Sequence, residues 1–128
     1  MARYLTDYFL RGAVQRGNAV EQFLGGFLHE QGPAVRWLAL RRKGRGVAVL
    51  LHEALDDGHL GCDIYEFTAL NDDPDKLYDP TAKHRCDTLE QALDLAAKLY
   101  GASPDRFVNE GLIQDEYQDF VAGRRVGP

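Results

Sequence analysis

The expected fold is decided by residues 35–55, VRWLALRRKGRGVAVLLHEAL. Two runs rich in valine and leucine flank the polar segment KGRG at 43–46. Such runs are typical of β-strands, and glycine supplies the positive φ angles that a tight turn needs. The stretch therefore predicts a β-hairpin with strands over residues 35–42 and 47–55.

A third strand is expected immediately after this hairpin. The turn sequence DDG at 56–58 precedes residues 60–70, which carry Ile64, Tyr65 and Phe67. Residues 71–85 then form a predicted polar loop that contains two prolines. Because parallel strands need a crossover of about a dozen residues or more, these short connections predict an antiparallel meander.

The clearest helix is predicted over residues 89–100, with Thr88 as its N-cap and Gln91 at the capping-box position. Its apolar stripe, which is expected to face the sheet, consists of Leu89, Ala92, Leu93, Ala96 and Leu99. Two further helices are predicted from apolar residues at helical spacing, one over residues 6–16 and one from Leu112 to Gly123.

One segment, Val20–Leu28, is left open between helix and strand. Apolar residues recur through it at helical spacing. The adjacent glycines Gly25 and Gly26 would destabilise a helix by about 2 kcal/mol relative to alanine. A strand that ends at the glycines accounts for the same residues, and the sequence supports both alternatives equally.

Together these elements predict a single α+β domain spanning residues 1–128. Its sheet is expected to be a three- or four-stranded antiparallel meander. An N-terminal helix and two C-terminal helices are expected to pack on one face of that sheet, because the apolar stripes of helices and strands must bury each other.

Composition places the chain among ordinary globular proteins, with 45% hydrophobic and 27% charged residues. No secretory signal is expected in the first residues, and no apolar run approaches the roughly 20 residues of a membrane span. We therefore expect a cytoplasmic protein without membrane contact. Eleven arginines against four lysines, with many alanines and glycines, suggest a GC-rich and bacterial origin.

Charge is distributed unevenly along the chain. Residues 1–50 hold eight basic and three acidic residues, a net charge of +5, whereas residues 51–128 hold seven and seventeen, a net charge of −10. The overall charge of −5 disfavours non-specific binding to nucleic acid, because phosphates would be repelled. It is compatible with a basic protein partner.

The sequence contains no recognisable motif for nucleophilic catalysis, phosphate binding or cofactor binding, and no cofactor is expected. Its single serine, Ser103, lies in a helix-start sequence. Two histidines and both cysteines are weak candidates for a tetrahedral zinc site: His59, Cys62, His84 and Cys86. Their spacings are unlike those of usual zinc sites, so we predict no metal.

A binding surface is predicted in the acidic part of the chain. Residues 51–82 hold nine carboxylates and a single base, Lys76. The expected partner-binding edge consists of Glu66, Asp72, Asp73, Asp75 and Asp79. An acidic surface of this kind can steer a basic partner toward rapid association.

The function favoured by these observations is that of a non-catalytic protein-binding module, such as an acidic inhibitor or immunity-type protein for a basic partner. One alternative is a small enzyme or metal-dependent site built on the carboxylates, histidine and cysteine of residues 56–66. Another is a homo-oligomer in which a sheet edge or exposed aromatics pair with a second copy.

Overall fold

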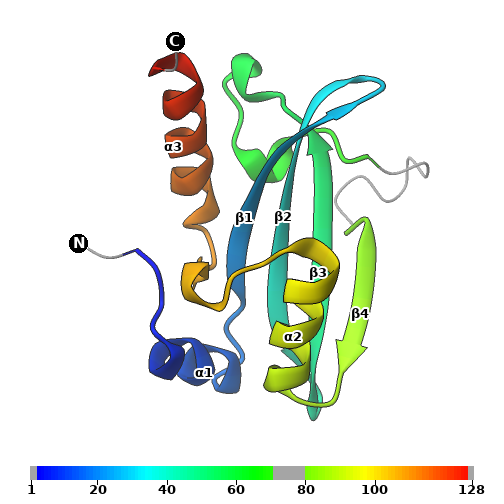
Figure 1. Ribbon diagram of the computed structural model, residues 1–128, viewed down its shortest axis with the longest axis vertical. Helices are drawn as coiled ribbons and strands as arrows, with labels where there is room; N and C mark the ends of the chain where they lie inside the picture. Colours follow the sequence, from blue (N-terminus) through cyan, green and yellow to red (C-terminus); the bar gives the residue numbers. More distant parts are fainter. Residues whose placement is uncertain (1–2, 71–79, 127–128) are drawn as a thin grey trace.

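The structure is a computed structural model that describes residues 3–70 and 80–126 (Figure 1). Its α-helices are α1 (Asp7–Gln15), α2 (Leu89–Tyr100) and α3 (Ile113–Val126). Its strands are β1 (Val20–His29), β2 (Gly32–Lys43), β3 (Gly46–Leu55), β4 (Ala82–Cys86) and β5 (Val108–Asn109). Short 3-10 helices are η1 (Gly58–Leu60), η2 (Ile64–Glu66) and η4 (Pro104–Arg106). Within the described ranges, no helix has the length and apolar character that a membrane crossing needs.

The sheet is antiparallel, with the strand order β4-β3-β2-β1-β5. Its first four strands form a meander, which confirms the predicted antiparallel α+β architecture. The predicted hairpin joins β2 to β3, with Lys43 paired to Gly46 across the turn. The sheet has five strands rather than three or four, because the short strand β5 adds to the outer side of β1.

The segment Val20–Leu28, for which the sequence allowed either a helix or a strand, is a strand. The strand continues through both glycines. The pairing with β2 shifts register between Phe23 and Gly25, and Gly25 has a φ angle of 101°. Such a bulge needs a residue that tolerates positive φ. At Gly26, a Cβ atom would lie 2.9 Å from the ring of Phe120, so glycine lets α3 approach the strand closely.

The prediction of a strand over residues 60–70 is wrong. This stretch forms η1 and η2, and within it only Ala69 makes a β-bridge, to Ala54. Gly61 has a φ angle of 77°, and Asp63 accepts a hydrogen bond from Tyr65 N that caps η2. Both features turn the chain away from a regular strand. The next strand beside β3 is β4, which lies within the stretch predicted as a polar loop except for its last residue, Cys86.

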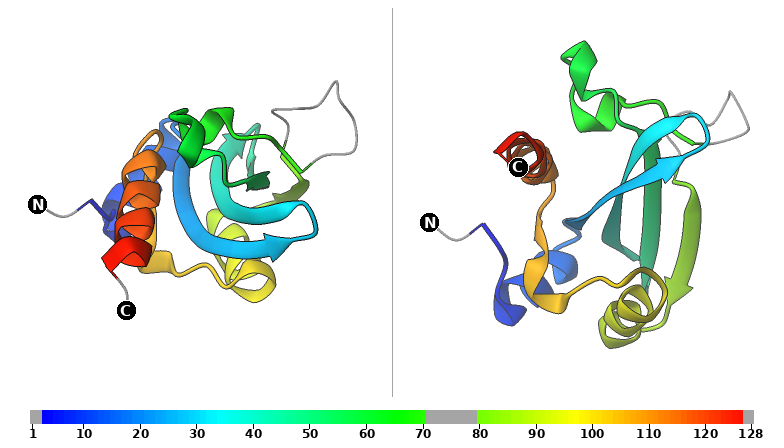
Figure 2. Two further views of the ribbon diagram at one scale, coloured as in Figure 1. Left: turned by 90° about the horizontal axis from the view of Figure 1, so that it is seen from above. Right: turned by 45° about the horizontal axis from the view of Figure 1, so that its top comes forward.

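Helices cover both faces of the sheet, whereas the sequence predicted them on one. One core cluster joins Leu38 and Leu40 of β2 to residues of α1 and α2. A second joins Val35 and Trp37 of β2 to residues of α3 and η2. Because alternate residues of a strand point to opposite faces, the two clusters lie on opposite sides of the sheet. Figure 2 shows α2 on one side of the curved sheet and η1 and η2 on the other.

The limits of α2 confirm the prediction. Thr88 Oγ1 accepts a hydrogen bond from Gln91 N at 3.1 Å, and the next residue after the helix, Gly101, has positive φ. The face toward the sheet is narrower than predicted, because its fully buried residues are the alanines at 92 and 96. Leu99 is 57% exposed and Leu93 is half-buried. Truncating a fully buried leucine to alanine lowers the free energy of unfolding by about 2–5 kcal/mol. The loss for Leu93→Ala should be smaller, because this leucine is only half-buried.

The other two helices also occur where they were predicted. α1 begins directly after Thr6, although the side chain of that residue makes no capping hydrogen bond. Gly17, which follows α1, has a positive φ angle of 84°. α3 begins at Ile113 and continues through Gly123 to Val126, so the glycine does not end it.

Candidate functional site

The predicted acidic edge lies mostly outside the part of the chain that the structure describes. Glu66 is exposed at the end of η2. Asp72, Asp73, Asp75 and Asp79 lie outside the described residues. That partner-binding surface therefore stays a prediction.

The four weak metal candidates do not come together. Cys62 packs beside the core cluster that contains α3, whereas Cys86 is buried in the cluster on the opposite face. His59 is exposed in η1, and His84 Nε2 is hydrogen-bonded to the hydroxyl of Tyr100 at 2.6 Å. Across residues 3–70 and 80–126, no group of three or more histidine, cysteine, aspartate or glutamate side chains is placed to hold a metal ion.

The carboxylates of residues 56–66 make separate local contacts. Asp56 accepts a hydrogen bond from the hydroxyl of Tyr117, and Asp57 accepts two from Thr68. Asp63 caps η2. A cavity of about 360 Å³ is lined by Asp56 and His59, but not by Cys62, Asp63 or Glu66. The structure therefore does not assemble the predicted alternative site as one cluster.

A different feature stands out at the edge of the sheet beside β1. β5 pairs with β1 only at Val20 and Glu21, and no other described strand pairs with that side of β1. A cavity of about 490 Å³ lies next to the edge, a size common among ligand sites. Its lining includes Phe23, Leu24 and Gly25 of β1, Arg106 of η4, and Glu116 and Phe120 of α3. We call this cavity the edge groove.

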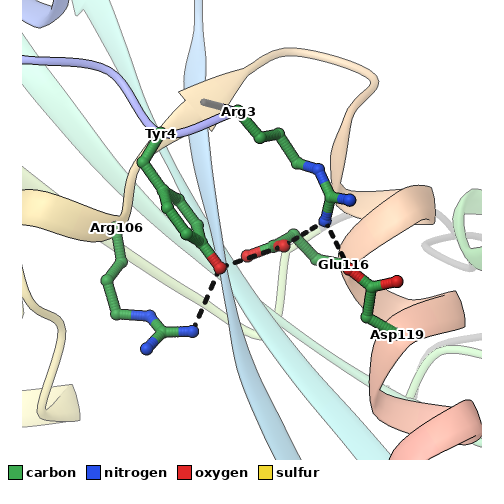
Figure 3. Close-up of polar contacts among 5 residues, drawn as sticks. All are labelled: Arg3, Tyr4, Arg106, Glu116 and Asp119. Atoms are coloured by element: carbon green, nitrogen blue, oxygen red, sulfur yellow. Dashed lines mark hydrogen bonds and ion pairs between the residues drawn. The ribbon is translucent and has the colours of Figure 1, made fainter. Parts of the chain in front are cut away.

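Five polar side chains meet beside the edge groove: Arg3, Tyr4, Arg106, Glu116 and Asp119 (Figure 3). Arg3 Nη1 donates to Glu116 Oε2 and, at 2.9 Å, to Asp119 Oδ2. Tyr4 OH donates to the same Glu116 oxygen at 3.2 Å. On the opposite side of the phenol, Arg106 Nη2 donates to Tyr4 OH at 3.1 Å, and its guanidinium lies 5.2 Å from the ring centre.

The surroundings of Tyr4 and Arg3 fix the protonation states of both side chains. Burial, together with the hydrogen bond to Glu116, raises the pKa of Tyr4, so its hydroxyl remains a neutral donor near pH 7. The hydrogen bond to Asp119 raises the pKa of Arg3, which stays charged. Among the described residues that line the groove there is no histidine or cysteine, the side chains that most readily exchange protons near neutral pH.

A side-chain amide fixes the wall of the edge groove to β1. Gln22 Nε2 donates to the carbonyl of Ser103 at 2.8 Å, and Ser103 N donates to Gln22 Oε1 at 2.9 Å. These two hydrogen bonds resemble a pair from a β-ladder. They hold the segment that connects α2 to η4 against β1. Gln22 is itself buried.

On the other face of β1, a buried carboxyl group ties the strand to η2 and to the turn before α3. Tyr65 OH donates to Glu21 Oε1 at 2.5 Å. Gly111 N lies 3.0 Å from both the Glu21 oxygen and the Tyr65 hydroxyl. Burial raises the pKa of Glu21. Burial and the neighbouring Glu21 also raise the pKa of Tyr65, which stays protonated.

Replacing Glu21 by glutamine is expected to remove a pH-dependent loss of stability. Because the folded-state pKa is raised, the folded protein binds more protons than the unfolded chain between the two pKa values. The favourable contribution of Glu21 is complete below its ordinary pKa of 4.5 and is lost as the pH rises through the folded-state value. Glutamine keeps the acceptor oxygen without the charge.

The measurement for this variant is urea unfolding at a series of pH values from below 4.5 to neutral. Glu21→Gln should show a flatter pH dependence than the wild type and at least equal stability at neutral pH. A variant with the wild-type pH dependence would show that Glu21 is not the group responsible.

The residues of the edge groove were missed by sequence reasoning. One local signal was available, because Glu116 and Asp119 are three residues apart on a predicted helix and so share one side of it. Their cation is Arg3, which is 113 residues from Glu116 in the sequence. No spacing rule links residues so far apart, so the cluster is visible only in the folded chain.

Comparison of the chain with protein-family models, with curated proteins and with solved structures finds no match.

Proposed function

We propose that this domain is a non-catalytic protein-binding module that takes up an extended segment of a partner along the free side of β1. The observation that carries the proposal is that β1 continues from Gln22 to His29 beyond its pairing with β5, with the edge groove alongside. Proteins commonly recognise peptides by adding a strand to such an edge: main-chain hydrogen bonds supply affinity, and neighbouring pockets supply specificity.

The hairpin geometry indicates which main-chain groups are available for strand addition. His29 and Gly32 pair across a two-residue turn, so their N–H and C=O groups bond to each other. In an antiparallel ladder, the N–H and C=O groups of successive residues point alternately toward the partner strand and away from it. The main-chain groups of Leu28 and Gly26 therefore point away from β2, toward the free side of β1.

Charge supports a basic partner. The net charge of the chain is −5, which attracts a positively charged protein and speeds its association. An inhibitor or immunity-type protein of a bacterial cytoplasm fits this description, and it is the class that we propose. A second copy of the chain on the same edge is the competing alternative.

Selection from an unbiased library of short displayed peptides, followed by amide hydrogen exchange of the complex, tests the proposal. A bound strand should slow exchange at the amides of Gly26 and Leu28 by about tenfold or more, because each amide gains a hydrogen-bond acceptor.

A matched pair of variants separates main-chain from side-chain effects. Leu28→Pro removes one outward N–H and should weaken peptide binding by about five- to tenfold. Leu28→Ala keeps that N–H and should change binding by no more than about twofold, since the leucine side chain is 84% exposed. The proposal is wrong if no peptide binds, or if bound peptides leave both amides unchanged. Protection that appears only as the free protein dimerises would instead place a second copy on the edge.

A further inference from the structure

The two carboxylates of the edge groove are arranged to bind one guanidinium group. Glu116 and Asp119 lie one helical turn apart on α3, and each accepts a hydrogen bond from the same nitrogen, Nη1 of Arg3 (Figure 3). Charge-assisted hydrogen bonds of this kind suit the planar, permanently charged guanidinium group. The two carboxylates therefore form a binding site for an arginine side chain, and in the free protein Arg3 occupies this site.

The two carboxylates differ in how strongly they require a cation. Glu116 is 8% exposed, and a carboxylate this buried is costly without a positively charged partner. The Asp119 side chain is 69% exposed, and its pairing with Arg3 is correspondingly weak. A guanidinium group beside Glu116 is therefore favourable, but it need not belong to Arg3.

Arg3 is held mainly through its side chain. In the part of the chain that the structure describes, the first main-chain hydrogen bond is the one from Leu5 N to the Phe107 carbonyl at 2.8 Å. The Arg3 side chain is 30% exposed, so solvent and a competing group can reach it. An exchange of Arg3 for another arginine would keep Glu116 paired throughout.

We propose that Glu116 and Asp119 form a receptor for an arginine side chain of the bound partner segment, and that Arg3 occupies this receptor in the free protein as an intramolecular competitor. The inference rests on the proposed function, because the segment that carries the arginine lies along β1. Arg106 is engaged with Tyr4 at the same cluster and leaves the two carboxylates to the incoming arginine.

Two synthetic peptides test the exchange: acetyl-TVRVT-amide and the same peptide with citrulline, an uncharged isostere, in place of its arginine. Binding to the isotopically labelled protein is followed by NMR titration. Wild-type protein should bind the arginine peptide about three- to tenfold more tightly than the citrulline peptide. Arg3→Ala should strengthen binding of the arginine peptide by a similar factor, because the competitor is gone, and leave the citrulline peptide unchanged.

Variants of α3 supply the control. In the Arg3→Ala protein, Glu116→Gln should abolish the preference for arginine. Asp119→Asn should reduce that preference. Because the Asp119 side chain is exposed, this variant should fold as the wild type does. Asp115→Asn changes an exposed carboxylate of the same helix that does not line the edge groove, and it should leave the preference intact.

The outcomes separate the two proposals. Equal binding of both peptides, with slowed exchange at Gly26 and Leu28, would overturn the arginine receptor and leave strand addition standing. An arginine preference that Arg3→Ala does not increase would overturn the role of Arg3 as a competitor. Absence of binding by both peptides, with no change at the edge amides, would overturn the receptor and count against the proposed function as well.

Discussion

Replacing Phe107 by alanine is expected to lower the free energy of unfolding by about 3–5 kcal/mol. Phe107 is 1% exposed and belongs to the core cluster that contains α1 and α2. Its removal loses apolar burial and leaves a cavity that rigid β-strands close only in part. Its carbonyl also accepts the hydrogen bond from Leu5 that anchors the segment carrying Tyr4.

Urea unfolding measures this loss, with Leu99→Ala as the control. Leu99 is 57% exposed on α2, so its truncation should change stability by no more than about 0.5 kcal/mol. A loss below about 1 kcal/mol for Phe107→Ala would mean that the surrounding structure collapses around the site far more completely than close-packed cores usually do.

The second large effect is expected at Gly46, where alanine should destabilise the protein by roughly 3 kcal/mol. A Cβ atom at this position would lie 2.4 Å from the carbonyl oxygen of Cys86. That oxygen belongs to the main chain of β4, whose pairing with β3 begins at Val47 and Cys86. The contact can be relieved only by moving a strand, because no side-chain rotation removes a main-chain atom.

Gly123→Ala is the matched control, since it makes the same chemical change where no neighbouring atom lies within 4 Å. Gly123 is inside α3, so alanine should stabilise the protein by about 0.5–1 kcal/mol through its better helix propensity. If both variants changed stability by similar amounts in urea unfolding, steric contact at Gly46 would not be the cause of the effect.

The elements that could be predicted are those defined by local signals. The hairpin around residues 43–46 has its glycines between two apolar runs, and α2 has a capping threonine before a helical stripe. The strand predicted over residues 60–70 is wrong because the β-branched and aromatic side chains there do not have the spacing of a strand. Leu60, Ile64 and Phe67 in fact recur at intervals of four and three, which is not the alternation of a strand.

The predicted placement of all helices on one face of the sheet is wrong for a related reason. A strand buried on both faces carries a continuous apolar run in place of an alternating one. Residues 47–51 form such a run in β3, and this was the available sign that both faces of the sheet are covered. The edge groove had no comparable sign. Its parts come from the N-terminal segment, β1, η4 and α3, and only tertiary packing brings them together.

The long separation between Arg3 and Glu116 has a consequence for synthesis of the chain on the ribosome. Residues that pair across 113 positions can meet only after every residue between them has emerged. The β1–β2–β3 hairpins involve nearer neighbours and can form earlier. During that interval β1 has neither β5 nor α3 beside it, and an uncovered strand edge is the part of a nascent sheet most prone to pair with another chain. Chains that stop before β5 should therefore aggregate through the same edge that the finished domain is proposed to offer to its partner.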